Sequence, residues 1–277
     1  MSVSRDPLTG QLVVVNTDRQ DRPNLPTKSC PFCVGGLEAP DLYYVTSFEN
    51  RWPAMPDERC EVVLYTPDHN ATFASLEPER AAAVVELWAE RSAAFAARDD
   101  IAAVLVFENR GEAVGATISH PHGQIYAFDS VPPTIEAELN GPCAICRERP
   151  GERLAVEGEG WRAWVPEAAA WPYELLLAPD EHVPDLMNVS PPALADILVD
   201  VLARLDRLFG APMPYMLWIH QRPCDGDEWP YAHVHVHIAP AMRAHKTQRF
   251  VAAGELGSGV FFNPVDPETA ADDLRQA

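Results

Sequence analysis

The sequence has 277 residues, of which 47% are hydrophobic and 22% charged, a composition typical of a folded globular protein with one or two domains. It carries 41 acidic and 21 basic residues, for a net charge of −20, which argues against nucleic acid or an anionic membrane as a partner. No apolar run reaches the ~18 residues of a membrane span, and the N-terminus lacks the pattern of a secretory signal, so we expect a cytoplasmic protein.

Two sets of elements follow one another along the chain. Alternating β-branched and aromatic residues indicate strands, and the alanine- and leucine-rich run that begins at Pro78 indicates a helix, with proline in its first turn. The first set is a pair of strands at 41–47 and 61–67, a helix at 78–98, and strands at 101–109 and 122–128. The second set is a pair of strands at 159–166 and 173–179, a helix from Pro191, and strands at 214–220 and 233–240, with a short acidic helix at 267–277. This order predicts an α+β fold in which helices pack on antiparallel sheets.

The two sets are joined by a repeat with an offset of 113 residues. Several rare residue types that share one offset predict two copies of one structural unit. The copies span roughly 30–140 and 143–275, so we expect two domains, 1–140 and 141–277. The chemically informative pairs are Cys30/Cys143, Cys33/Cys146, His69/His182, His120/His233 and His122/His235, and Glu61/Glu174 and Leu64/Leu177 follow the same shift.

Each copy offers two cysteines and two histidines, the ligands of a tetrahedral zinc site. The first set is Cys30, Cys33, His69 and His120, and the second is Cys143, Cys146, His182 and His233. A thioredoxin-like redox pair or a plain surface loop would also explain a Cys-x-x-Cys motif. Neither explains why the histidines recur at the same offset, so we predict one zinc site and a second like it. Cys60 and Cys224 lack such counterparts and are interpreted as plain thiols.

The segment His120-Pro121-His122-Gly123-Gln124 heads a predicted strand, so alternate side chains share one face. If His120 binds zinc, His122 is presented at a fixed position. A neutral imidazole, with its other nitrogen held by a carbonyl, is a good nucleophile toward phosphorus. Gln124 can donate to a phosphoryl oxygen, and we interpret Gly123 as room for a phosphate to approach the backbone. The alternative is that His122 merely supports the metal site.

This motif resembles the active site of the galactose-1-phosphate uridylyltransferase family, in the histidine triad superfamily. The segments DPLTGQ, CPFC, FENRW, PDH, FENRG and HVHVHIAP also follow the family's order, over nearly the whole chain. The resemblance implies two histidine-triad-like halves, and a homodimer with sites built across the interface. It further implies transfer of UMP from UDP-glucose to galactose 1-phosphate through a uridylyl-His122 intermediate, with zinc and no organic cofactor.

The resemblance also assigns binding residues. The residues that match nucleotide- and phosphate-binding positions are Arg19, Arg22, Asn50, Trp52 and Asn109, and those that match the hexose-binding segment are Arg249, Phe250 and Glu255. Some relatives place a second metal on positions matching Glu138, His220, His235 and His237. We expect this set to compete with the Cys143 set, and favour the cysteines because they repeat the first site. Arg51 stands where the family has an acid, so base and hexose preference stay open.

Three other functions fit parts of the sequence. A phosphorylase of the same fold would release the nucleotide of ADP-glucose or a similar donor. A hydrolase would use the histidine trio at 233–237 in place of His122. A zinc-stabilised binding module would retain nucleotide without turnover.

Overall fold

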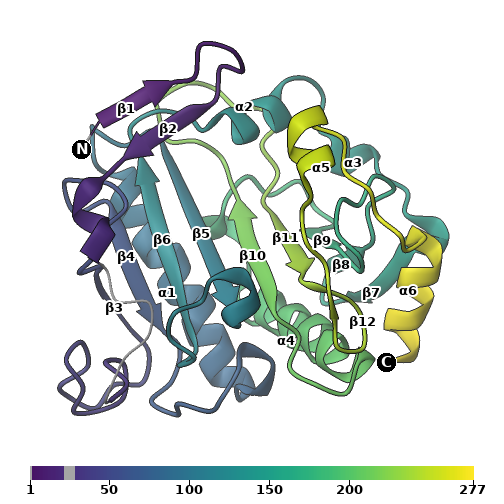
Figure 1. Ribbon diagram of the computed structural model, residues 1–277, viewed down its shortest axis with the longest axis horizontal. Helices are drawn as coiled ribbons and strands as arrows, with labels where there is room; N and C mark the ends of the chain where they lie inside the picture. Colours follow the sequence, from purple (N-terminus) through teal and green to yellow (C-terminus); the bar gives the residue numbers. More distant parts are fainter. Residues whose placement is uncertain (1, 22–28) are drawn as a thin grey trace.

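The computed structural model describes residues 2–21 and 29–277, and a nine-stranded antiparallel sheet runs across it (Figure 1). The strands pair in the order β3-β4-β6-β5-β10-β11-β9-β8-β7. Their bounds are β3 Thr46–Glu49, β4 Cys60–Leu64, β6 His122–Phe128, β5 Ala103–Arg110, β10 Tyr215–His220, β11 His235–Pro240, β9 Leu175–Pro179, β8 Trp161–Trp164 and β7 Leu154–Gly158. The predicted α+β class is confirmed.

The sheet is built from two similar halves that meet where β5 pairs with β10. Read outward from that pair, the first half runs β5, β6, β4, β3 and the second runs β10, β11, β9, β8. Apart from β7, an additional strand at the edge of the second half, each half has its long helix between its second and third strands in chain order. Both halves share one sheet and one hydrophobic core, so the division into two domains at residue 140 stays a proposal.

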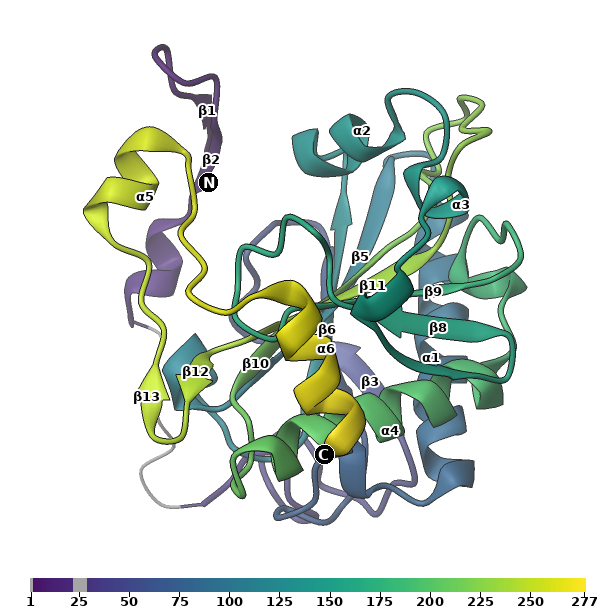
Figure 2. The ribbon, with the colours of Figure 1, turned by 90° about the vertical axis from the view of Figure 1, so that its right-hand side faces the viewer.

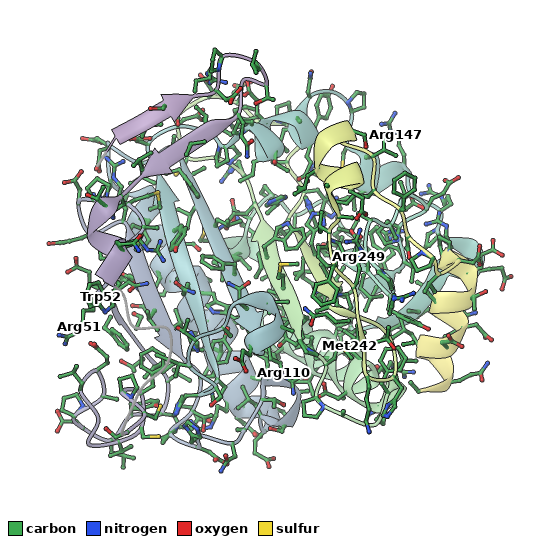
Figure 3. The ribbon with its side chains drawn as sticks, viewed as in Figure 1. Arg51, Trp52, Arg110, Arg147, Met242 and Arg249 are labelled. Carbon is green, nitrogen blue, oxygen red and sulfur yellow. The ribbon has the colours of Figure 1, made fainter. Side chains whose placement is uncertain are left out.

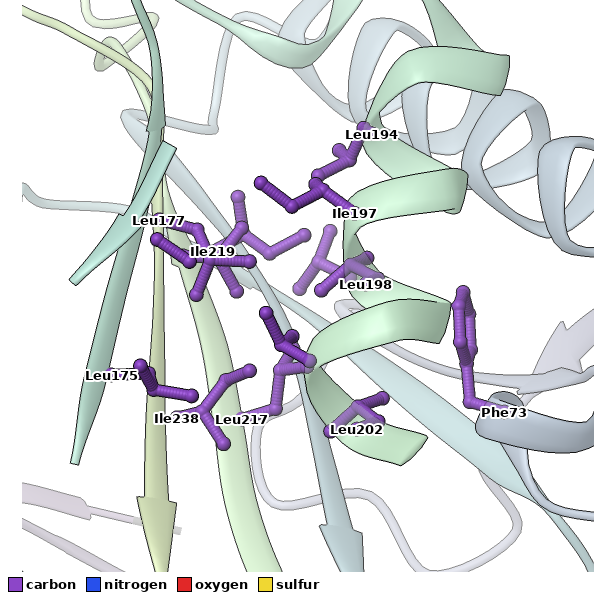
Figure 4. Close-up of a cluster of buried hydrophobic side chains, with 14 of the residues drawn as sticks. Phe73, Leu175, Leu177, Leu194, Ile197, Leu198, Leu202, Leu217, Ile219 and Ile238 are labelled. Atoms are coloured by element: carbon purple, nitrogen blue, oxygen red, sulfur yellow. The ribbon is translucent and has the colours of Figure 1, made fainter. Parts of the chain in front are cut away.

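The two long helices cover one face of the sheet. They are α1 (Pro78–Ala96) and α4 (Pro191–Leu208), and each begins with a proline in its first turn. Apolar residues three or four positions apart form the buried stripe of each helix. In α4 this stripe includes Leu194, Ile197 and Leu198, which pack on β-strand side chains such as Leu217 (Figure 4). The opposite face carries polar side chains such as His122 and Gln124, together with two small apolar clusters around Phe32 and Ile145.

Smaller elements surround the sheet. A hairpin of β1 and β2 and the short helix α5 project on the side away from α1 and α4 (Figures 1 and 2). The bounds are β1 Ser2–Arg5, β2 Leu12–Val15, α2 Pro133–Leu139, α3 Ala144–Arg147, β12 Met242–Ala244, β13 Thr247–Gln248, α5 Ala253–Ser258 and α6 Pro267–Gln276, with 3-10 turns at Thr17–Asp21, Phe73–Ser75, Glu112–Val114, Gly151–Arg153 and Leu186–Asn188. Among the described residues, no helix combines the length and apolarity needed to cross a bilayer.

The sequence offset fails at one pair of strands. Leu64 and Leu177 are 113 residues apart, yet Leu64 packs with Phe32, whereas Leu177 packs in the core beneath α4. The second copy has one more residue, Glu181, between its Pro-Asp dipeptide and His182. A shift of one residue turns a strand's side chains to the other face of the sheet. The sequence match at Leu64 and Leu177 is therefore no structural match.

Candidate active site and metal centres

His122 is the first residue of β6, and its ring orientation is fixed by the backbone. Its Nδ1 donates to the carbonyl oxygen of His120 at 2.8 Å. A neutral imidazole that donates from Nδ1 carries its lone pair on Nε2. The edge of Phe32 packs against the ring, with the centroids 5.0 Å apart. The contacts therefore hold the tautomer and the plane that a nucleophilic Nε2 requires.

Gln124 follows on the same face of β6, because side chains alternate along the strand. Its Oε1 accepts from Nδ2 of Asn50 at 3.3 Å. The Oδ1 of Asn50 in turn accepts from the backbone N–H of Trp52 at 2.9 Å. With its oxygen engaged, the Gln124 amide has its NH2 group as the donor for a phosphoryl oxygen.

The other residues assigned to the nucleotide lie in different parts of the fold. Asn109 lies on β5, the strand that pairs with β6, which carries His122. Arg19 is half-buried in the turn Thr17–Asp21. That turn is tied to the Trp52 loop by Asn16, whose Nδ2 donates to the carbonyl of Pro53 at 3.0 Å. Arg22 lies outside the described residues.

The first cysteine–histidine set is assembled beside His122. The ligand atoms of Cys30, Cys33, His69 and His120 all lie within 4.8 Å of one another. Sγ of Cys33 is 3.5 Å from Nδ1 of His69 and 3.7 Å from Nδ1 of His120. Nε2 of His120 donates to the carbonyl of Thr66 at 2.8 Å, which leaves the lone pair on Nδ1 and aims it at the sulfurs. Two sulfurs and two nitrogens at this spacing fit zinc.

The second set repeats this arrangement at Cys143, Cys146, His182 and His233. Sγ of Cys146 lies 3.1 Å from Nδ1 of His182 and 3.4 Å from Nδ1 of His233. Nε2 of His233 lies 3.1 Å from the carbonyl oxygen of Pro179, so this histidine too offers Nδ1. The donor set again fits zinc.

A third group gathers Glu138 of α2 with His220, His235 and His237 of β10 and β11. An oxygen of Glu138 lies 2.6 Å from Nδ1 of His220 and 3.3 Å from Nε2 of His235. Burial raises the pKa of Glu138, but the hydrogen bonds from the two histidines outweigh it, and the pKa is lowered. This group shares no residue with the Cys143 set. The expectation that the two sets compete is therefore corrected: both are assembled at once.

The structure also corrects the reason for glycine at position 123. A Cβ on Gly123 would point to the helix-covered face, where it would lie closer than 3.0 Å to the hydroxyl oxygen of Tyr65. The small residue therefore makes room for a buried tyrosine, and the phosphate side of the strand is not involved. That tyrosine contacts Glu108, a buried residue whose importance we did not predict from the sequence. Its signal would have been an acid that directly follows a run of five apolar residues in β5.

The segment assigned to the hexose lies on the second half. Figure 3 shows Arg249 well separated from Arg51 and Trp52. The buried Arg249 pairs with Oε1 of Glu255 at 2.6 Å and stacks on Trp171, with 4.4 Å to the ring centroid. Glu255 also accepts from two backbone N–H groups, at 252 and 262. Phe250, by contrast, is 73% exposed.

The fold and these side chains together define a class of enzyme: duplicated α+β proteins with a histidine-bearing strand next to a cysteine–histidine metal set. Comparison with known proteins narrows the class. Residues 43–132 match the model for the galactose-1-phosphate uridyl transferase N-terminal domain, and residues 117–276 match the model for the C-terminal domain.

Individual relatives agree over the full length. The galactose-1-phosphate uridylyltransferase of Thermotoga maritima is 36% identical over 100% of this chain and 98% of its own. A solved structure of a uridylyltransferase superposes with a TM-score of 0.90 at 28% identity, covering 100% of this chain and 98% of that one. The structure of an ADP-glucose phosphorylase from Arabidopsis thaliana with bound ADP-glucose superposes with a TM-score of 0.80 at 25% identity. It covers 100% of this chain and 99% of that one. The chain belongs to the galactose-1-phosphate uridylyltransferase family, and it is a transferase.

Proposed function

We propose that this enzyme moves UMP from UDP-glucose to galactose 1-phosphate through a covalent intermediate on His122. The observation that carries the proposal is the 2.8 Å contact between Nδ1 of His122 and the carbonyl of His120, which commits Nε2 to the attack. The family membership supplies the substrate class. Nucleotide-sugar substrates and a cytoplasmic location are part of the same proposal. The location is supported by the cysteines, since none of the six in the described chain forms a disulfide.

The reaction has two displacements. In the first, Nε2 of His122 forms a bond to the α-phosphorus of UDP-glucose, and the bond to the bridging oxygen breaks, releasing glucose 1-phosphate. In the second, a phosphate oxygen of galactose 1-phosphate attacks the same phosphorus, and the P–N bond breaks to give UDP-galactose. The Gln124 NH2 group donates to the phosphoryl oxygens, whose charge grows in each transition state.

Zinc at the first cysteine–histidine set would supply structural stabilisation, because four protein ligands close its tetrahedron. The residues that would hold it are Cys30, Cys33, His69 and His120. His120 is 99% buried and bridges this set to the nucleophile through its own carbonyl. The ligand set would thereby fix the position of His122 without touching the substrate.

A homodimer is also part of the proposal. Arg249, in the segment assigned to the hexose, lies well away from Trp52 of the same chain (Figure 3). Exposed apolar side chains on the projecting hairpin and the α5 segment, such as Val14, Phe250 and Leu256, favour a second copy as the covering surface. Each site would then take its hexose contacts from the partner chain.

The hydrolase alternative is disfavoured by the third group. His235 is the counterpart of His122, and its Nδ1 likewise donates to a carbonyl, that of His233 at 2.7 Å. Its Nε2, however, is directed at Glu138 at 3.3 Å. A nitrogen engaged in this way is a poor candidate for attack on phosphorus. The phosphorylase alternative keeps the chemistry of His122. The likeness to the ADP-glucose phosphorylase makes it the second candidate function.

The test is the intact mass of the protein after mixing with UDP-glucose, quenched at alkaline pH to protect an acid-labile P–N bond. We expect a gain of one uridylyl group that galactose 1-phosphate removes and that His122→Ala abolishes, whereas His235→Ala retains it. An adduct formed with ADP-glucose alone would transfer the assignment to a phosphorylase. Binding of nucleotide without any adduct would identify a binding module and contradict the proposal.

A further inference from the structure

A buried carboxyl group lies beneath the strand that carries His122. Glu108 of β5 is 4% exposed and faces the helix-covered side of the sheet. The hydroxyl of Tyr65 donates to its Oε2 at 3.2 Å, and the hydroxyl of Tyr215 donates to its Oε1 at 3.0 Å. Arg110, the neighbouring cation, is paired through both terminal nitrogens with Asp206, at 2.7 and 3.0 Å. Glu108 is thus held by two tyrosines and not by a salt bridge.

Tyr65 links this carboxyl group to the backbone on both sides of His122. Its N–H donates to the carbonyl of Pro121 at 3.4 Å. Its hydroxyl occupies the space that a side chain at position 123 would fill. The ring is fixed by edge contacts with Phe73 and Trp88, at centroid distances of 5.5 and 5.9 Å. A displacement of the Tyr65 hydroxyl would therefore be passed to Gly123 and to the histidine next to it.

The other half of the molecule shows that the fold does not require a polar group here. Phe107 pairs with Gln124, so the same register places Glu108 opposite Gly123. In the second half the counterpart of Gly123 is Val236, and it lies opposite Ile219. Both are fully buried. Burial of a carboxyl group costs free energy that an apolar pair does not, so the catalytic half retains the acid for a reason other than packing.

We propose that Glu108 is a positioning residue for the uridylyl-transfer step: it holds the Tyr65 hydroxyl against Gly123 and so fixes the backbone from which His122 attacks. The inference rests on the proposed role of His122. The expected effect on the rate comes from the position of His122, since a misplacement of about 1 Å can slow a reaction by roughly 100-fold. We expect the effect in the chemical step, because these buried groups lie on the face of the sheet opposite to His122 and Gln124.

The chain offers a matched pair of variants. Tyr65→Phe and Tyr215→Phe each remove one hydroxyl, from a fully buried ring, that donates to the same carboxyl group. Tyr65 lies under the nucleophile strand, whereas Tyr215 lies on β10. A purely structural role of the cluster predicts equal effects of the two substitutions on activity. A positioning role predicts that they differ.

The experiment measures the single-turnover rate of uridylyl-enzyme formation, the affinity for UDP-glucose and the melting temperature. We expect Tyr65→Phe to slow adduct formation about 10- to 100-fold with unchanged affinity, and Tyr215→Phe to leave the rate within about twofold at a similar loss of melting temperature. Glu108→Gln should slow the step when Tyr65 is present and add little in combination with Tyr65→Phe.

Gly123→Ala supplies an independent check, because its new methyl group meets the Tyr65 hydroxyl. Combination with Tyr65→Phe should restore part of the lost rate. Equal rates for the two tyrosine variants, or no rescue of Gly123→Ala, would overturn the inference while adduct formation by the wild type upholds the role of His122. A wild type that forms no adduct would overturn both.

Discussion

The Nδ1 atom of His122 and the carbonyl oxygen of His120 are 2.8 Å apart, so the nucleophile is oriented by the backbone of a residue from the metal set. His235 repeats this relationship with the carbonyl of His233 at 2.7 Å. The two halves therefore hold a histidine in the same way, and Glu138 lies 3.3 Å from Nε2 of His235.

Loss of one ligand of the first set should reduce metal content, stability and activity together. Cys30→Ser removes a thiolate from a group whose ligand atoms converge only in the folded chain, so metal binding and folding are coupled. We expect about one equivalent less zinc by elemental analysis and a melting temperature lower by roughly 5 °C or more. Cys224→Ser, at a thiol outside all three groups, is the control. Unchanged metal stoichiometry in Cys30→Ser would refute the site.

Removal of the Gln124 amide should slow the chemical step and leave the fold intact. Gln124→Ala deletes a donor aimed at oxygens whose charge grows in the transition state, so we expect kcat to fall by about 100-fold. The melting temperature should change little, because the side chain is only half-buried. Steady-state kinetics beside Gln248→Ala, a glutamine on a different strand, would check this. A kcat equal to that of the wild type would remove Gln124 from the mechanism.

The Cys143 set and the Glu138 group should bind metal independently. Cys143→Ser breaks the cysteine–histidine set, and Glu138→Gln breaks the group with His220 and His235. Because the sets share no residue, we expect each substitution to remove one equivalent and the double variant to remove two. Elemental analysis of protein loaded with zinc or iron would measure this. Loss of both metals in either single variant would show that the groups are one coupled site.

The buried acid should give the protein a particular dependence of stability on pH. Burial raises the pKa of Glu108 from 4.5 to about 7, and the hydrogen bonds from the two tyrosines only partly oppose it. A raised folded-state pKa contributes stability that is present below about 4.5 and lost as pH rises through about 7. The difference in unfolding free energy between wild type and Glu108→Gln should therefore change by about 3 kcal/mol over this range.

Urea unfolding of both proteins at several pH values would measure the difference. The charged neighbours Arg110 and Asp206 are present in both proteins. Wild type should lose stability relative to Glu108→Gln as pH rises. Parallel stability curves from pH 4 to 8 would mean that Glu108 titrates normally.

The sequence by itself was sufficient for the repeat, for the order of two strands, a helix and two strands within it, and for the two cysteine–histidine sets, whereas β7 and the β1–β2 hairpin were not predicted. These rest on local signals: strand alternation, a proline at the start of each long helix, and soft ligands at one fixed offset. The same signals placed His122 and Gln124 on one face of a strand. The predicted helix at 78–98 is observed as Pro78–Ala96, because the buried stripe of α1 lies within those residues.

The tertiary structure alone decided which side chains from distant segments contact one another on the two faces of the sheet. Glu138 joins three histidines from β10 and β11 across a long stretch of sequence, so no spacing rule shows that this group coexists with the Cys143 set. Strand register decided that Gly123 faces Tyr65 and Glu108, and that Leu64 and Leu177 face opposite sides. A one-residue change in a loop reverses such an outcome without altering the local pattern. The physical reason is that side-chain partners across a sheet depend on pairing between distant segments.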